Sequence, residues 1–314
     1  MVSQFTNFPA SDDPAAGDRA PLDPDALADS LRPFGESRML PRAAYVDPAV
    51  FEWEQRHFFG GGWLCAGRSS QVPAPGDLRA EPVGAGSVLL ACGEDGALRA
   101  FANTCRHRGH ELLPCGSAAQ QRVIICPYHS WTYSLNGSLR AAAGFKNRPG
   151  FQADRWGLVE LPAAEWHGLV FVDGSGAAGP LADSLGTLEE FVAPYEPERL
   201  VVAGQHDYEV AANWKILTEN YHECYHCPVI HPELCEVSPP KSGENYSAPG
   251  TWAAPPTVVA PPPVGTPATP LRANASSACN RERGASARRW IPCVVHRPAP
   301  GMSGSWLLSS LASG

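Results

Sequence analysis

Two short cysteine-histidine motifs constrain this chain more than any other feature of its sequence. The first is Cys105-Arg106-His107, and after 18 intervening residues the second follows as Cys126-Pro127-Tyr128-His129. Each motif offers one thiolate and one imidazole, so the two loops together present two sulfur ligands and two nitrogen ligands. Four unrelated buried residues would hardly repeat the same pairing on two loops, and we therefore expect a metal centre.

Two kinds of metal centre fit this pattern. In a [2Fe–2S] cluster with mixed ligands, one iron takes both thiolates and the other takes both imidazoles, so each loop must supply one ligand of each kind. A single zinc ion also binds four Cys and His ligands, but zinc pairs usually come as Cys-x2-Cys or His-x3-His. The mixed pairs therefore favour the cluster, whose potential is raised by neutral imidazoles to a value that suits an electron carrier.

Composition excludes several other classes of protein. The 314 residues are 44% hydrophobic and 18% charged, which is typical of a globular chain. No apolar run approaches the ~18 residues of a membrane span, and the N-terminus shows no signal or transit peptide, so we expect a cytoplasmic protein without a membrane partner. The net charge of −8, without a basic stripe, disfavours nucleic acid. Ten cysteines in a reducing compartment favour free thiols or metal ligands.

The chain divides into four expected regions. Residues 1–38 are a flexible arm rich in Pro, Asp and Ala; 39–173 form a domain with an entry helix; 174–247 begin a second domain; and 248–314 are a Pro-rich, anomalous tail. The tail has 11 prolines after residue 248, and Glu282 is its only carboxylate. It is either a disordered tail or the product of a shifted reading frame, and both explanations stay open.

The first domain shows the pattern of a small antiparallel β structure. The Asp47-Pro48 turn predicts the start of the entry helix. Two strand-like runs, Ser87–Cys92 and Ala97–Ala102, are joined by Gly93-Glu94-Asp95-Gly96, where both glycines are expected to take the positive φ of a hairpin turn. Further strands are expected at 123–126, 131–134 and 169–172.

The cysteine-histidine loops also carry a resemblance to a known family. NTCRHRGHELLPCG followed by CPYHSWTYSLNG resembles the Rieske domain of the ring-hydroxylating (Rieske non-haem iron) oxygenases, large or alpha subunit, and the resemblance runs from about Leu40 to Leu234. It implies an α+β fold, with an all-β Rieske domain beside a helix-grip catalytic domain that is incomplete here. It also implies a homotrimer and an NAD(P)H-dependent reductase or ferredoxin as electron donor. The implied cluster ligands are Cys105, His107, Cys126 and His129.

A second group of candidate ligands lies in NWKILTENYHECYHCPVIHPEL, residues 213–234. Apolar residues at a spacing of three to four predict a helix that ends at Pro228. On it, Glu219, Glu223 and His226 fall at i, i+4 and i+7 and so share one face, and a turn could bring His231 back to meet His226. Two histidines and a carboxylate leave open positions on Fe(II) for O₂ and substrate.

Two other interpretations of this segment remain. It is either a solvated helix with scattered polar residues or an adventitious zinc site that uses Cys224, Cys227 and His222. The family resemblance favours the iron site instead.

By that resemblance, His226 and His231 ligate the mononuclear iron. Glu223 matches the acid that joins a cluster histidine of the neighbouring subunit to an iron ligand, and Glu219 and Asn220 line the site. The acid-to-histidine spacing resembles that of oxygenases acting on quaternary amines such as glycine betaine.

One departure from the family pattern concerns the third iron ligand. The family supplies an Asp well downstream, yet Asp207 is the last Asp of this chain. We therefore expect the cluster to form while mononuclear iron binds weakly or not at all. Two functions stay open: a terminal oxygenase component for O₂-dependent hydroxylation or demethylation of a small aromatic or quaternary-amine substrate, and a cluster-only electron-transfer or vestigial protein.

A glycine-rich segment could be mistaken for a nucleotide site. Gly174-Ser175-Gly176-Ala177-Ala178-Gly179 matches the dinucleotide-binding pattern G-x-G-x-x-G. Pro180 follows directly, and no second parallel strand is evident. We expect a surface loop, so that NAD(P)H is used by a separate reductase.

Overall fold

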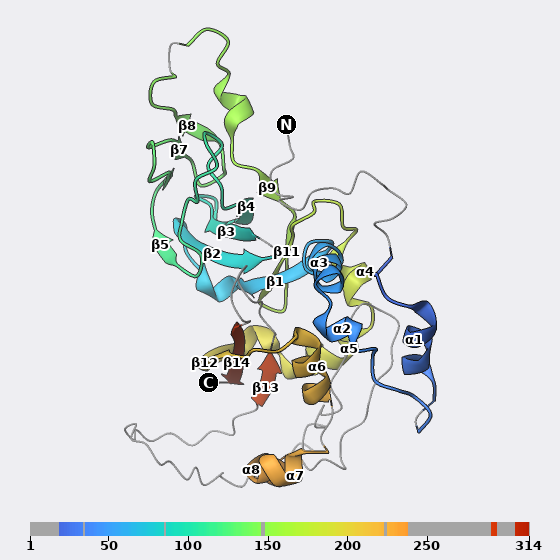
Figure 1. Cartoon of the computed structure of the whole chain (residues 1–314). Coiled ribbons are helices and arrows are strands. Elements are labelled where there is room, and N and C mark those ends of the chain that lie inside the picture. Colours follow the sequence, from blue (N-terminus) through green and yellow to red (C-terminus); the bar gives the residue numbers. More distant parts are fainter. Residues whose placement is uncertain are drawn as a thin grey trace. The chain divides into compact units, whose positions relative to one another are not determined.

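The structure is a computed structural model in which the described residues are 19–237, apart from 34, 85, 146–147 and 223–224, together with 290–293 and 305–313. The chain forms two compact units, residues 1–185 with 297–304 and residues 186–296 with 305–314 (Figure 1). No helix among the described residues is long and apolar enough to span a membrane.

The first unit begins with short helices. α1 (Pro24–Ala28) is capped by Asp23, and α2 (Ala43–Val46) precedes α3 (Pro48–His57). The entry helix is confirmed, because the Asp47 carboxylate accepts a hydrogen bond from the Ala49 backbone N–H at 2.9 Å and Pro48 occupies the first helical turn. The flexible arm stays a prediction, since residues 1–18 lie outside the described part.

Three antiparallel sheets follow these helices, and the short helix α4 (Leu181–Leu185) comes after the last strand. The largest has the order β5-β2-β3-β4-β9, a second has the order β1-β11-β10, and a third has the order β6-β7-β8 (Figure 1). Their bounds are β1 (Trp63–Arg68), β2 (Asp77–Val83), β3 (Gly86–Cys92), β4 (Leu98–Ala102), β5 (Ala118–Gln120), β6 (Ile124–Ile125), β7 (Thr132–Tyr133), β8 (Leu139–Ala141), β9 (Glu160–Leu161), β10 (Ala163–Trp166) and β11 (Leu169–Asp173). The expected strands are therefore present, and the β-rich character of this unit is confirmed.

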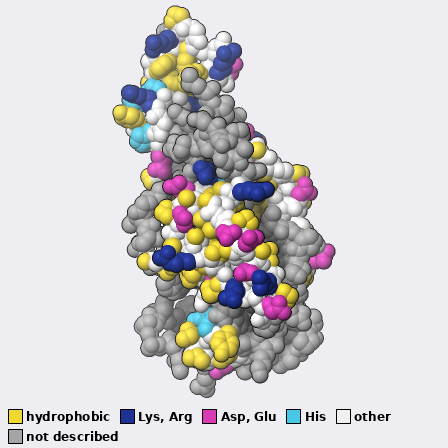
Figure 2. All heavy atoms as spheres, turned by 45° about the vertical axis from the view of Figure 1, so that its right-hand side comes forward, with side chains coloured by type: hydrophobic (Ala, Val, Ile, Leu, Met, Phe, Trp, Pro, Cys, Tyr) yellow, Lys and Arg dark blue, Asp and Glu magenta, His cyan; other side chains and the backbone are white. Residues whose placement is uncertain are grey.

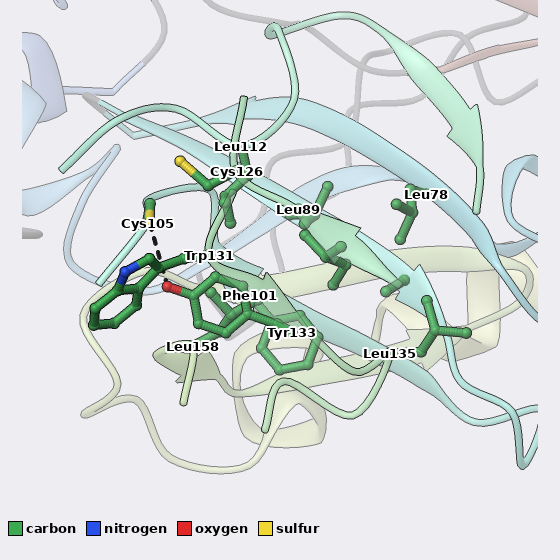
Figure 3. Close-up of a cluster of buried hydrophobic side chains, with 12 residues drawn as sticks. Leu78, Leu89, Phe101, Cys105, Leu112, Cys126, Trp131, Tyr133, Leu135 and Leu158 are labelled. Carbon is green, nitrogen blue, oxygen red and sulfur yellow. Dashed lines mark hydrogen bonds between the residues drawn. The ribbon is translucent and has the colours of Figure 1, made fainter. Parts of the chain in front are cut away.

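Strand β3 lies between two hydrophobic cores. Successive side chains of a strand point to opposite faces, and here Val88 and Leu90 enter one core while Leu89 and Ala91 enter the other. All four are fully buried. This is why the run is apolar throughout instead of alternating with polar residues. The Leu89 face continues into the cysteine-bearing loops (Figure 3).

The predicted hairpin between β3 and β4 is confirmed, with one correction. Gly96 has φ +74°, but Gly93 does not take a positive φ. Gly93 donates its N–H to the Ala97 carbonyl at 2.9 Å, and the side chain of Asp95 bonds the Ala97 N–H at 3.1 Å. One left-handed residue suffices because Asp95 supplies part of the turn through its side chain.

The second unit combines helices with a small sheet. Its elements are α5 (Leu188–Val192), β12 (Leu200–Glu209), α6 (Trp214–His222), α7 (Cys227–Ile230), α8 (Pro232–Val237), β13 (Trp290–Cys293) and β14 (Ser305–Ser313), and the sheet order is β12-β14-β13. Two strands thus lie within 248–314, and the remainder of that segment is outside the described residues. The disordered or frame-shifted tail and the four-region division stay predictions, whereas the α+β class is confirmed.

Candidate metal centre

The first ligand loop follows β4 and carries Cys105 and His107. It is closed on itself because Cys105 N–H donates to the His110 carbonyl at 2.8 Å and Gly109 N–H donates to the Cys105 carbonyl at 3.0 Å. The side chain of Asn103, which is 1% exposed, ties the start of the segment 103–113 to Leu113 at its end. Its amide donates to the Leu113 carbonyl at 2.7 Å, and its carbonyl accepts from the Leu113 N–H at 3.1 Å.

Sequence analysis assigned no role to Asn103. A buried amide must satisfy both its donor and its acceptor, and this one does so by fixing the loop that presents the ligands. The only available signal was its position two residues before Cys105.

The second ligand loop is the tip of a two-stranded hairpin. β6 and β7 pair with Ile125 opposite Thr132, which leaves Cys126 and His129 on the tight connection. Cys126 N–H donates to the Trp131 carbonyl at 2.8 Å, and Ser130 N–H donates to the Cys126 carbonyl at 3.0 Å. Ser130 has φ +56°, a left-handed conformation that is costly for a residue with a side chain.

The structure brings the two loops together, with like ligands paired. Cys105 and Cys126 are 2% and 1% exposed and lie in the same buried cluster, where Cys126 contributes to raising the pKa of the Cys105 thiol. The rings of His107 and His129 are half-buried, with centroids 4.7 Å apart. Among the described residues, no three Cys, His, Asp or Glu side chains converge on one ion. A two-iron cluster with mixed ligands needs one sulfur pair and one nitrogen pair, and both pairs are present here.

An orphaned nitrogen supports the fit to a metal. His107 Nδ1 is buried and has no hydrogen-bond partner in the described structure. Such an atom is costly unless it binds something. Burial lowers the pKa of His107, with smaller contributions from His129 and Arg108. The ring is therefore kept neutral, which is the form that ligates metals.

Tyr133 is the second residue that sequence analysis missed. Its hydroxyl lies 3.3 Å from Cys105 Sγ and accepts a hydrogen bond from the Arg106 N–H at 3.1 Å (Figure 3). Burial and the contact with Cys105 raise the pKa of Tyr133 far above its ordinary value, so its proton remains available for donation to sulfur. Burial raises the pKa of the Cys105 thiol, while the Tyr133 hydroxyl acts in the opposite direction.

An aromatic wall encloses the imidazole of His107. Trp131, which is 1% exposed, stacks on that ring with centroids 4.8 Å apart and planes at 8°. Phe145 and Trp156 meet Trp131 edge to face, at 5.4 Å and 5.8 Å between centroids. Trp131 therefore packs at the ligand loops. Tyr128 also packs at the loop, with its ring centroid 3.8 Å from that of His129.

The second group of candidate ligands departs from the predicted single helix. α6 ends at His222, so Glu219 and His226 do not share one helical face; Glu223 and Cys224 lie outside the described residues. Pro228 does not end a helix but lies in the first turn of α7, where its missing N–H is not needed.

The two histidines of this group do meet as predicted. His226 precedes α7 and His231 follows it, and their ring centroids are 5.4 Å apart. His231 N–H donates to the Cys227 carbonyl at 2.8 Å. Glu219 is half-buried and Asn220 is exposed. The residues described here supply two nitrogens for a metal, and the assigned roles of the acids and of Asn220 remain predictions.

The glycine-rich segment 174–179 has a structural explanation. Asp173 is fully buried, and its carboxylate accepts hydrogen bonds from the Ser175 N–H at 2.9 Å and the Ala178 N–H at 2.8 Å. The Trp63 indole donates to the Gly179 carbonyl at 2.8 Å. Amides that would cradle a phosphate in a nucleotide site already bind a carboxylate here. Both neighbours of β11 are antiparallel, which supports the surface loop.

Comparisons with known proteins agree with this site. Residues 62–152 match the Rieske [2Fe-2S] domain, and residues 197–306 match the ring hydroxylating alpha subunit (catalytic domain). The chain is 38% identical over 227 residues to the glycine betaine monooxygenase oxygenase subunit of Chromohalobacter salexigens, covering 72% of this chain and 49% of the relative. It is 37% identical over 198 residues to the carnitine monooxygenase oxygenase subunit of Acinetobacter baumannii, covering 62% and 53%.

Solved structures of Rieske oxygenases also resemble this chain. The quaternary ammonium Rieske monooxygenase CntA in complex with L-carnitine is 33% identical, with a TM-score of 0.61 over 66% of this chain and 59% of that one. Naphthalene 1,2-dioxygenase with indole bound is 29% identical, with a TM-score of 0.55 over 61% and 44%. The chain spans about half the length of the curated relatives it matches. The two matched domains imply two cofactors, a [2Fe–2S] cluster and a mononuclear iron. The chain therefore belongs to the family of Rieske non-haem iron oxygenase alpha subunits.

Proposed function

We propose that this chain acts as the oxygenase component of a Rieske monooxygenase on a quaternary amine of the glycine betaine or carnitine type. A cluster held by these residues would supply single electrons, and a mononuclear iron would supply the site for O₂-dependent oxidation of the substrate. The relatives named above act on those two amines. A small aromatic substrate is the weaker proposal, supported by the likeness to naphthalene 1,2-dioxygenase.

The observation that carries this proposal is the pairing of ligands in the first unit. Two buried thiols lie together, two imidazoles lie together, and one buried imidazole nitrogen has no protein partner in the described structure. This donor set fits a mixed-ligand two-iron cluster, in which one iron takes both sulfurs and the other takes both nitrogens.

The mononuclear iron would be held by His226 and His231 of the second unit. Glu223 would orient the ligating imidazoles through hydrogen bonds and join the site to the cluster of a neighbouring subunit in a homotrimer. Glu219 and Asn220 would line the site. An NAD(P)H-dependent reductase or a ferredoxin would supply the electrons in the cytoplasm.

A second candidate function is electron transfer without oxygenation. In the described residues of the second unit, His226 and His231 lie together. Two nitrogen ligands hold Fe(II) less firmly than two nitrogens and a carboxylate. We therefore expect full occupancy of the cluster and low occupancy of the mononuclear iron.

Iron analysis and turnover separate the two functions. The cluster alone predicts about two iron atoms and about two acid-labile sulfides per chain. NADH-dependent consumption of glycine betaine or carnitine with a reductase would establish the oxygenase. In that case His226→Ala should abolish consumption and leave the cluster's electron paramagnetic resonance signal intact. A fully occupied high-spin Fe(II) site would contradict the expected weak binding, and zinc alone after reconstitution with iron and sulfide would overturn the proposal.

A further inference from the structure

Three buried nitrogen atoms at the ligand loops have no hydrogen-bond partner in the described structure. They are Arg106 Nε, His107 Nδ1 and Trp131 Nε1. Buried polar atoms without a partner are rare in folded proteins and call for an explanation. His107 Nδ1 is explained as a predicted iron ligand, which leaves two N–H donors. Trp131 is the stricter case of the two, because an indole has one polar hydrogen whereas a guanidinium has five.

Solvent does not satisfy this N–H group. The lobe that contains β7 and β8 in Figure 1 lies at the top of Figure 2, where histidine, Lys and Arg side chains reach its surface and can bind water. Trp131 directly precedes β7 but is only 1% exposed. An unpaired N–H at that depth opposes folding. The indole therefore needs an acceptor inside the protein.

The neighbouring ligand side chains do not accept this hydrogen. The planes of Trp131 and His107 lie 8° apart, and an indole N–H lies in the plane of its own ring, so it points past the imidazole and not at it. Cys105 and Cys126 belong to the same buried cluster as Trp131, yet neither sulfur accepts a hydrogen bond from the indole. An acceptor that arrives with a bound group would complete the site.

The indole lies among the predicted cluster ligands. Its ring stacks on His107, and its backbone carbonyl accepts a hydrogen bond from the Cys126 N–H at 2.8 Å. Figure 3 shows the nitrogen-bearing edge of the Trp131 ring on the side of Cys105. The unpaired donor thus shares its surroundings with both thiols and one ligand imidazole.

We propose that the Trp131 indole N–H donates a hydrogen bond to an inorganic sulfide of the [2Fe–2S] cluster and thereby raises the reduction potential of that cluster. The inference rests on the proposed function, because it requires the cluster. Reduction adds one electron from the reductase or ferredoxin and no proton, so the sulfurs become more negative. A hydrogen bond to sulfur therefore stabilises the reduced state more than the oxidised state.

A contact with an aromatic ring is the alternative role for this N–H. Phe145, Phe151 and Trp156 meet the Trp131 ring edge to face, with centroids 5.4, 6.0 and 5.8 Å away. An N–H group can point at the face of such a ring, but this interaction is weak. A charged sulfide is the stronger acceptor. The two roles differ in their effect on the cluster, because only the sulfide bond changes its potential.

The direct test replaces the N–H group and keeps the ring. Benzothienylalanine, in which sulfur stands in place of the indole N–H, is introduced at residue 131 of the full chain by nonsense suppression. Its reduction equilibrium constant in an optical redox titration should fall about tenfold, which is about 59 mV for one electron. Trp131→Phe should shift the potential in the same direction. The matched control Trp156→Phe removes an indole from the same aromatic wall and should keep the potential of the unsubstituted protein.

Resonance Raman spectroscopy tests the same bond without a potential. The cluster is reconstituted in H₂O and in D₂O, and the iron–sulfide bands of the benzothienylalanine protein should shift less between the two solvents than those of the unsubstituted chain. An unchanged potential or an unchanged isotope shift in that protein would overturn the inference, as would an equal potential change in Trp156→Phe. These results leave the proposed function standing, whereas an unsubstituted chain without any cluster signal would contradict the proposed function itself.

Discussion

His107 and His129 lie 4.7 Å apart between ring centroids, and His226 and His231 lie 5.4 Å apart, so the two units each hold a pair of imidazoles in nearly the same relation. Their surroundings differ. The first pair is backed by two buried thiols and by Trp131, and its loops end on sheet strands. The second pair flanks a four-residue helix whose Val229 and Ile230 are 81% and 63% exposed.

The difference shows how each pair is held. A four-residue helix is not stable by itself and depends on packing against other elements. The first pair rests on strand pairing and on a close-packed core, so its geometry is organised before a metal binds. The second pair flanks a helix that exposes Val229 and Ile230 to solvent.

The largest effect is expected from Cys126→Ser. Cys126 lies in the buried sulfur pair, and a serine hydroxyl does not replace a thiolate ligand of iron. The variant should lose essentially all visible absorption and electron paramagnetic resonance of the cluster. The matched change Cys115→Ser, at an exposed cysteine of the same loop region, should retain both. Loss in both variants would mean that the burial of the thiol pair is irrelevant to the site.

Core truncation should separate the two units by stability. Trp131→Ala removes a buried ring, at 1% exposure, that contacts His107, Phe145 and Trp156, and should cost about 3–5 kcal/mol. Tyr225→Ala, at 94% exposure in the second unit, should change stability by no more than about 0.5 kcal/mol. Urea unfolding followed by circular dichroism measures both. Equal losses of unfolding free energy in the two variants would contradict the contrast between a closely packed first pair and a more exposed second pair.

A smaller effect is expected on the cluster's potential. The Tyr133 hydroxyl near Cys105 stabilises the more negative, reduced cluster, so Tyr133→Phe should lower the reduction potential. A net hydrogen bond of about 0.5–1.5 kcal/mol corresponds to roughly 20–65 mV for one electron. Redox titration followed by optical spectroscopy measures the shift. Tyr128→Phe, which removes an exposed hydroxyl, should leave the potential unchanged, and an equal shift there would show that the Cys105 contact is unimportant.

The smallest effect is a gain in stability from Ser130→Gly. Ser130 has φ +56°, and glycine adopts that conformation without a side-chain penalty. Allowing for glycine's greater freedom in the unfolded chain, the net gain should be about 0.5–1 kcal/mol. Thermal unfolding of the cluster-bound protein measures it. Ser134→Gly, in the same hairpin but without a positive φ, should destabilise by a similar amount; stabilisation there would contradict the argument.

Local sequence patterns predicted much of the first unit and less of the second. Strand periodicity and the Asp47 cap depend on residues close in sequence, and both were confirmed. The Tyr133 contact with Cys105 spans 28 residues, and Asn103 bonds across ten, so neither follows from periodicity. The predicted single helix was wrong because Pro228 was assumed to end a helix, whereas it begins one.

The amino-acid sequence by itself identified the candidate ligands, because one Cys-x-His motif and one Cys-x-x-His motif limit the metals that can bind. It also indicated where strands and the entry helix begin. Only the tertiary structure decided that thiol lies beside thiol and imidazole beside imidazole, that Tyr133 faces Cys105, and that Asp173 closes the glycine-rich loop. These contacts join residues far apart along the chain, and sheet pairing and burial, which act in space, bring them together.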